Sequence, residues 1–246
     1  MDPAHTAFLH TIISGAVFTD EFGVLPELEF VETPVGMMYI ATRRVEDNVW
    51  TRMAEAVLPN LQQVPPIWED GRREHAFSGP MMTRWIVPVD DTNTMLIELR
   101  YVSETQGVTP AWWADGAMIP AQLPAESYET GQRQPGDYEA QVSQRPIAVH
   151  ALEHLVAADR GVAMFRIQTR RGIKAVQNGD DPAGLGRHDT VAPTYCSNTV
   201  VRMPADRDPA MDRELMRKAG RQLADRYLKN PPLLGGPPAP SRAVAE

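Results

Sequence analysis

The chain has 246 residues, 43% of them hydrophobic, which suits one domain with a sizeable core. Its net charge of -8 and its pI near 5.3 argue against nucleic acid or an anionic membrane surface as the main partner, because both require a basic patch. Cys196 is the single cysteine, so neither a disulfide framework nor a cysteine-rich cluster can form within this chain.

No apolar stretch approaches the ~20 residues of a membrane span, and no charged-then-apolar signal peptide opens the chain. The sequence therefore predicts a cytoplasmic protein without a membrane partner.

The first ten residues place Asp2, His5 and His10 on one short segment, which suggests a metal site. An Asp-Pro pair often begins a helix, because proline at the first helical position loses no hydrogen bond. Residues five apart diverge by roughly 140° on a regular helix, so His5 and His10 could share an ion only on a distorted one. A π-bulge returns such residues to nearly the same face and is frequent at functional sites. From spacing alone, two unconnected histidines near a chain start remain the alternative.

Alternating and β-branched residues predict two hairpins, over residues 27–33 with 37–42 and over residues 82–89 with 94–102. Residues 49–59 are ambiguous between helix and strand. Pro88 within a predicted strand indicates an edge or a bulge. Residues 103–136 form a long loop that includes Trp112-Trp113, and loops of this length are functional or mobile.

Helices are predicted around residues 147–157 and over 159–177, with Asp159 as the N-cap and Asn178-Gly179 as the stop. The C-terminal helix begins with Asp208 as cap and Pro209 in the first position. Its apolar stripe predicts packing on the sheet and comprises Met211, Leu215, Met216, Ala219, Leu223 and Tyr227. Residues 230–246 are rich in proline and glycine and are predicted to be a disordered tail.

His150 and His154, with Glu153 between them, form a competing candidate for zinc. Their order is not His-Glu-x-x-His, so the general-base geometry of that hydrolase motif is missing. We expect histidines on a helix face that bond to acidic neighbours, and a zinc hydrolase is the alternative. His75 and His188 have no partner near in sequence and are expected to face solvent.

Residues 2–10, DPAHTAFLH, resemble the Asp-x-x-His-x-x-x-x-His segment in the catalytic domain of Rieske non-haem iron oxygenases, particularly the alpha subunits of the phthalate-dioxygenase-like branch. Three later stretches are similar to the same family: the 33–36 turn with the basic pair at 43–44, the 85–91 hairpin, and residues 137–141 with the sequence DYEAQ. The chain departs from the family pattern at residues 145–150.

The resemblance implies a mononuclear Fe(II) bound by His5, His10 and Asp137. It also implies that Asp2 is a catalytic residue that links an iron-bound histidine to the Rieske cluster of a neighbouring subunit. Zinc would accept the same ligands, but it has no redox step with which to reduce dioxygen.

The predicted elements give an α+β fold, an antiparallel sheet with helices packed on it. The resemblance refines this fold to a helix-grip domain over residues 1–229, with residues 103–136 as a lid over the substrate pocket; a plain surface loop is the alternative. A Rieske [2Fe–2S] centre needs two cysteines and two histidines, so the cluster is expected on an upstream domain. The chain would then be an N-terminally truncated piece, the product of a misplaced start codon at Met1, or one half of a split system.

The implied activity is hydroxylation or O-demethylation of a small organic substrate, expected to be aromatic, with O₂ and with electrons from NAD(P)H through a reductase or ferredoxin and the Rieske cluster. The family also implies a homotrimer, and we expect the isolated chain to have little turnover. The alternative function is a non-catalytic helix-grip module that binds an apolar small molecule.

Overall fold

The computed structural model describes residues 2–13, 20–66, 71–101, 125–185 and 193–231. Eight strands lie in the described part of the chain: β1 (Glu27–Thr33), β2 (Gly36–Val45), β3 (Asn48–Val57), β4 (Leu61–Val64), β5 (His75–Ser78), β6 (Met82–Pro88), β7 (Thr94–Arg100) and β8 (Ser197–Arg202). The helices described there are α1 (His5–Ala7), α2 (Tyr128–Arg133), α3 (Asp137–Val142), α4 (Arg160–Gln177) and α5 (Pro209–Lys229). Helical turns of other types are the π-helix η1 (Phe8–Ile13) and the 3₁₀ turns η2 (Asp20–Gly23), η5 (His150–Leu152) and η6 (Ala157–Asp159).

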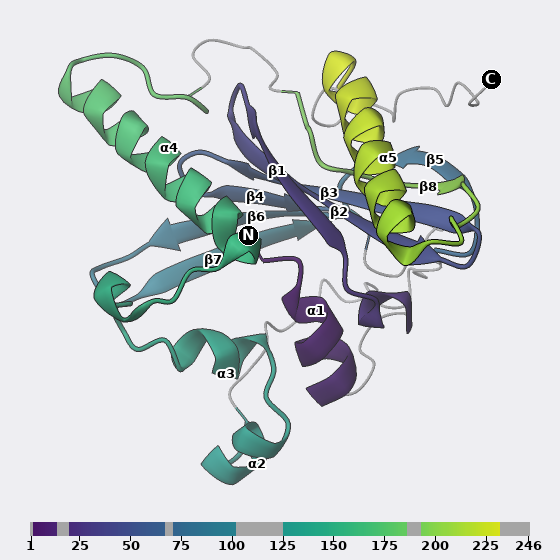
Figure 1. Ribbon diagram of the computed structural model, residues 1–246. Helices are drawn as coiled ribbons and strands as arrows, with labels where there is room; N and C mark the ends of the chain where they lie inside the picture. The colour runs from purple at the N-terminus through teal and green to yellow at the C-terminus, as the bar shows by residue number, and fades with distance from the viewer. Residues whose placement is uncertain (1, 14–19, 67–70, 102–124, 186–192, 232–246) are drawn as a thin grey trace.

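The strands form one antiparallel sheet in the order β1-β2-β3-β4-β6-β7, with β8 beside β3 and β5 beside β8 (Figure 1). Strand β3 serves both branches, because its residues 48–53 pair with β8 and its residues 55–57 pair with β4. This architecture confirms the predicted α+β class. It also shows that the ambiguous stretch 49–59 is mainly strand.

Both predicted hairpins are present. β1 pairs with β2 so that Thr33 lies opposite Gly36, and β6 pairs with β7 so that Pro88 lies opposite Thr94. A Cβ on Gly36 would lie 2.0 Å from the main-chain oxygen of Ala56, so the turn needs a glycine there. Strand β6 pairs with β4 only as far as Trp85, and Pro88 is the last residue of β6. The N–H that Pro88 lacks would therefore have no partner on β4, so no sheet hydrogen bond is lost.

Helix α5 packs on one face of the sheet, as predicted, and contacts β1, β2 and β3 (Figure 1). Asp208 caps it by accepting a hydrogen bond from the main-chain N–H of Ala210. Predicted stripe residues Met216, Ala219, Leu223 and Tyr227 are buried. Met211 is 55% exposed, contrary to the prediction, because the neighbouring Asp212 takes the inward position.

Helix α4 lies on the opposite face, as alternation along β1 shows. Glu29 points toward α5 and forms an ion pair with Arg221. The next residue, Phe30, points the other way and lies so close to Gly161 of α4 that a Cβ there would meet its ring at 2.4 Å. The two long helices therefore cover different faces of the same sheet.

The predicted helix over 147–157 is wrong, since only the 3₁₀ turns η5 and η6 form around it. Ile147 and Leu152 are each 59% exposed, so these apolar residues have no core that would hold a helix in place. Asp159 stands at the N-cap position of α4, but its carboxylate accepts from the N–H of Val156 instead of capping the helix. The stop at Asn178-Gly179 is confirmed, with Gly179 at φ 83°.

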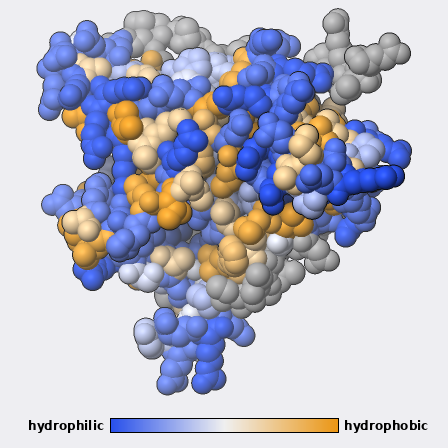
Figure 2. All heavy atoms as spheres, viewed as in Figure 1, coloured by the Kyte–Doolittle hydropathy of each residue, from blue (hydrophilic) through white to orange (hydrophobic). Residues whose placement is uncertain are grey.

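Strand β7 exposes consecutive apolar residues, among them Leu96 and Ile97 at 48% each. Consecutive strand residues point to opposite faces, so the described residues leave both faces of β7 largely open. Figure 2 shows apolar patches on the surface around this part of the sheet. The β6–β7 hairpin therefore adds sheet pairing but little of the hydrophobic core.

The predicted lid, 103–136, is described only from residue 125 onward, where α2 and the start of the segment leading to α3 lie. Residues 102–124, including the tryptophan pair, fall outside the described residues, and so does most of the predicted tail. None of the described helices combines the length and apolar character needed to cross a membrane.

Candidate metal centre

The N-terminal segment begins with a tight turn that Asp2 organises. Its Oδ1 accepts hydrogen bonds from the main-chain N–H groups of Ala4, at 2.9 Å, and of His5, at 3.2 Å. The helix therefore begins at His5, two residues later than the Asp-Pro signal predicts, with Pro3 in the turn. From Phe8 to Ile13 the segment is a π-helix, which confirms the predicted distortion.

This distortion brings the two histidines together. The ring centroids of His5 and His10 lie 5.1 Å apart, and their planes are inclined at 65°. A regular α-helix would send the two side chains in directions roughly 140° apart. The π-helical turn thus lets both rings face the same point.

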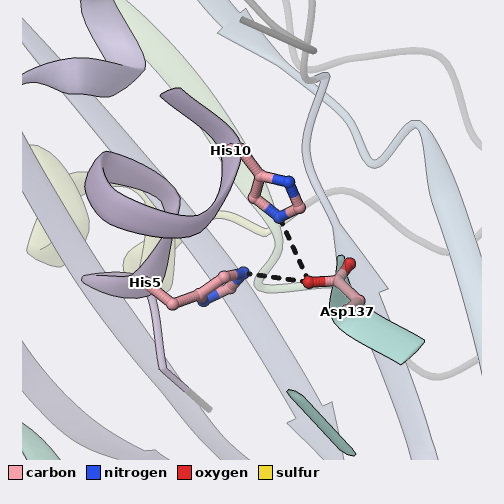
Figure 3. A group of neighbouring side chains, drawn as sticks. All are labelled: His5, His10 and Asp137. Atoms are coloured by element: carbon pink, nitrogen blue, oxygen red, sulfur yellow. Dashed lines mark ion pairs between the residues drawn. The ribbon is translucent and has the colours of Figure 1, made fainter. Parts of the chain in front are cut away.

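Asp137, the first residue of α3, completes the group from a distant part of the sequence (Figure 3). Its Oδ1 lies 3.2 Å from Nε2 of His10 and 3.7 Å from Nε2 of His5. The three side chains point toward one another, and one ligand atom from each lies within 4.8 Å of the others. Among the described residues, His5, His10 and Asp137 are the acidic and histidine side chains that lie close enough together to bind one metal ion.

The three side chains differ in their exposure to solvent. His10 is 4% exposed, whereas the side chains of His5 and Asp137 are 37% and 39% exposed. The hydrogen bond with His10 holds the pKa of Asp137 below its usual value, even though partial burial acts in the opposite direction. Asp137 is therefore a carboxylate at neutral pH and can offer an anionic oxygen.

Asp2 also orients His5 through its main chain. Nδ1 of His5 lies 2.5 Å from the carbonyl oxygen of Asp2, and the Oδ2 of Asp2 is 3.8 Å from the same nitrogen. A carbonyl can only accept, so Nδ1 carries the proton and Nε2 keeps its lone pair on the side of Asp137. Metal-binding histidines in proteins are commonly held in this way.

The donor set fits a divalent transition metal. Imidazole nitrogens and carboxylate oxygens bind such ions at roughly 2.1 Å, so two ligand atoms of one ion lie at most about 4.2 Å apart. The distances of 3.2 and 3.7 Å from Asp137 to the two histidines satisfy this limit. Three ligands from one side leave the rest of the coordination sphere for other groups, which is the facial triad arrangement of two histidines and one carboxylate.

The competing zinc candidate loses its geometric basis. His150 and His154 are exposed and lie in a 3₁₀ turn and the loop after it, so the four-residue spacing places them on no helix face. Glu153 binds the guanidinium of Arg166 with two hydrogen bonds of 2.6 and 2.9 Å. His75 is only half exposed and contacts Asn198 at 3.3 Å, which corrects the expectation of a solvent-facing side chain. His188 lies outside the described residues.

Two further residues next to the group were not predicted to belong to the site. Thr6 follows the first histidine, and its hydroxyl donates to the main-chain oxygen of Pro3. Arg43 reaches the same two residues from β2. The sequence held one sign of this role, the two adjacent arginines at 43–44 within a strand. Successive strand residues point to opposite faces of the sheet, so each face receives one cation.

Comparison with known proteins gives two relatives. The chain is 34% identical over 245 residues to the oxygenase subunit of tert-butanol monooxygenase / tert-amyl alcohol desaturase from Aquincola tertiaricarbonis, an alignment that covers 91% of this chain and 52% of the relative. It is 33% identical over 189 residues to the phenoxybenzoate dioxygenase subunit alpha from Ectopseudomonas oleovorans, covering 75% and 43%. The chain thus spans about half the length of these relatives. No protein-family model matches it.

Proposed function

Since this chain belongs to the alpha subunits of the Rieske non-haem iron oxygenases, we propose that it supplies the mononuclear iron domain of such an enzyme. His5, His10 and Asp137 are the proposed ligands. The observation that carries the proposal is their convergence from the N-terminal segment and from α3, two parts of the chain that do not adjoin in sequence. Histidines and a carboxylate on one side of the ion are the donor set of non-haem Fe(II) oxygenases.

The chain's own residues prepare this site in three ways. His5 and His10 would each bind the ion through one ring nitrogen, and the main-chain oxygen of Asp2 fixes the tautomer of His5. Asp137 supplies one negative charge, which partly neutralises a divalent ion. Fe(II) held there would supply the redox chemistry with dioxygen that these side chains lack.

The remaining parts of the proposal concern partners. Electrons are proposed to come from NAD(P)H through a reductase or ferredoxin and a Rieske cluster on another polypeptide segment or subunit, with Asp2 on the path from the cluster to His5. The chain is proposed to work in a homotrimer. One relative is named for an aliphatic alcohol and the other for an aromatic acid. We therefore propose a small organic substrate, either aromatic, as expected from the sequence, or aliphatic.

The proposal is tested by iron content after anaerobic reconstitution with Fe(II). The wild-type chain and a His154→Ala control, which removes an exposed histidine away from the group, are expected to bind close to one iron per chain. His10→Ala and Asp137→Ala are expected to lose most of it, because each removes one of three ligands. Circular dichroism would verify that all four proteins are folded.

Equal iron in the control and in both ligand variants would refute the assignment. A folded wild-type chain without iron would instead support the alternative of a non-catalytic module that binds an apolar small molecule.

A further inference from the structure

The two adjacent arginines of β2 point to opposite faces of the sheet. Arg44 reaches α5, where its Nε and Nη2 bind the two carboxylate oxygens of Asp212 at 3.1 and 2.5 Å. Arg43 turns to the other face, the one beneath the N-terminal segment. Both side chains are largely removed from water, but only Arg44 has a carboxylate partner among the described residues.

Arg43 connects β2 to two other segments, residues 3–6 of the candidate metal centre and the main chain at Val24. Its Nη2 donates to Oγ1 of Thr6 at 3.1 Å and lies 3.4 Å from the carbonyl oxygen of Pro3. Its Nε donates to the carbonyl oxygen of Val24 at 2.9 Å. The residue is 1% exposed, so these contacts are made without competition from water.

Aromatic rings hold the guanidinium group itself in place. Its central carbon lies 5.3 Å from the ring centroid of Phe22 and 5.6 Å from that of Trp50. These two rings meet edge to face at 5.1 Å, and both are fully buried. Arg43 is therefore a fixed element of the core, to which the N-terminal segment is attached.

Burying this cation is costly for stability. Its hydrogen bonds within the described residues go to neutral oxygen atoms, and its Nη1 has no hydrogen-bond partner there. Burial, together with the nearby Arg52, lowers the pKa of Arg43 to about 9, so the side chain remains charged at neutral pH. An apolar residue of similar size would serve stability as well or better. This cost suggests that Arg43 serves a role besides stability.

Two of the contacts of Arg43 flank His5 in the sequence. Pro3 and Thr6 lie on either side of this histidine in the sequence, and the carbonyl group of Asp2, which binds Nδ1 of His5, belongs to the peptide that joins Asp2 to Pro3. Holding Pro3 and Thr6 thus fixes the turn that sets the direction of the His5 ring. A metal site tolerates errors of only about 0.2 Å in its ligand distances.

We propose that Arg43 is a positioning residue for the metal centre, which fastens Pro3 and Thr6 to β2 and thereby aims His5 at the ion. This inference rests on the proposed function, since it presupposes that His5 is a ligand. Acceptors in different directions suit the planar fork of arginine, whereas the single ammonium group of lysine reaches fewer of them.

The test compares Arg43→Met and Arg43→Lys with Arg44→Met, a matched change one residue away that faces α5. Binding of Co(II) is followed anaerobically by its visible absorption bands, which report coordination geometry. Amide hydrogen exchange of the peptide covering residues 2–13 is measured on the metal-free proteins. Urea unfolding gives the stability of each variant.

Arg43→Met is expected to weaken Co(II) binding ~10-fold or more, the usual effect of losing a group that orients a ligand. It should also change the Co(II) bands and speed exchange in residues 2–13. Arg43→Lys is expected to restore part of both. Arg44→Met should lose stability through the Asp212 pair and yet keep wild-type Co(II) affinity and exchange.

If Arg43→Met does not fold, Thr6→Val tests the same contact from the other side. It removes the hydroxyl that accepts from Arg43 and donates to the main-chain oxygen of Pro3, while keeping the shape of the side chain, and Thr6→Ser is its rescue. Thr6→Val is expected to weaken Co(II) binding several-fold, and Thr6→Ser to leave it near wild type.

Wild-type Co(II) affinity and unchanged exchange in Arg43→Met or in Thr6→Val would overturn the inference. So would equal losses of affinity in Arg43→Met and Arg44→Met, because a general loss of stability would then explain both. A wild-type chain that binds no Co(II), combined with faster exchange in Arg43→Met only, would refute the proposed metal function but support the positioning of the segment.

Discussion

Glu55 in β3 is a buried carboxyl group whose titration should control stability near neutral pH. Its side chain is 0% exposed. Oε1 accepts a hydrogen bond from Thr33 at 3.1 Å, and Oε2 accepts one from the main-chain N–H of Tyr195 at 2.9 Å. Burial raises the pKa of Glu55 to about 7 in spite of these hydrogen bonds, which act to lower it. Replacing the group by the neutral amide in Glu55→Gln removes this titration.

The expected size follows from the pKa difference. A rise from 4.5 to about 7 corresponds to about 3 kcal/mol of preference for the protonated form in the folded state. Below pH ~4.5 the group is protonated in both states and this contribution is fully present. Between pH ~4.5 and ~7 the folded state binds more protons than the unfolded state, so the contribution is lost as the pH rises. Above pH ~7 the loss is complete.

The assay is urea unfolding of wild type and Glu55→Gln at pH 5 and pH 8. The difference in unfolding free energy between the two proteins should shift by about 2–3 kcal/mol between these pH values. Wild type should be less stable relative to Glu55→Gln at pH 8 than at pH 5. Other titrating groups are the same in both proteins, so their effects cancel in this difference. Glu153→Gln is the control, because its ion pair with Arg166 lowers the pKa of Glu153 and leaves no titration in this window.

A difference that stays constant from pH 5 to pH 8 would refute this reasoning, because it would mean that Glu55 titrates alike in the folded and unfolded chains. A shift of the opposite sign would mean that the two hydrogen bonds outweigh burial.

The remaining predictions concern one close backbone approach and one ion pair. Gly36→Ala should lower the free energy of unfolding by about 3 kcal/mol, because the new methyl group would meet the main-chain oxygen of Ala56. Gly79→Ala is the control and should change this free energy little, since its new methyl group meets nothing within 4 Å. Equal losses of the two variants in urea unfolding would contradict this prediction. Asp212→Asn should cost about 2–4 kcal/mol, because it leaves the partly buried guanidinium of Arg44 without its carboxylate, yet iron content should stay at the wild-type level. A loss below ~1 kcal/mol, typical of exposed ion pairs, would show that this contact is not a buried one.

Local patterns in the sequence were sufficient for the elements whose signals lie within a few residues. Alternation predicted both hairpins, and Asp208-Pro209 with the apolar stripe predicted α5. The five-residue spacing of His5 and His10 indicated that the two could share an ion only on a distorted helix, and the π-helix Phe8–Ile13 is that distortion. Spacing alone left two unconnected histidines as the alternative.

Other features depended on neighbours that are distant in sequence. Residues 48–57 are a strand because β2, β4 and β8 supply hydrogen-bond partners on both sides. Residues 147–157 look helical by composition, but no core surface receives their apolar side chains, so they form turns. Asp159 has a local partner in Val156 that competes with the capping role its position suggests.

The same division holds at the candidate metal centre. Residues 2–10 and 137–141 could be matched to a family segment by segment, and the local turn at Asp2 follows from its own side chain. That Asp137 lies 3.2 Å from His10 is decided by the path of the chain through the sheet and α3, which no local pattern encodes. Arg43 and Arg44 are the same residue type and adjacent in sequence, so the sequence alone does not distinguish their roles. Only the two faces of the folded sheet give one of them a carboxylate on α5 and the other the main chain around the histidines.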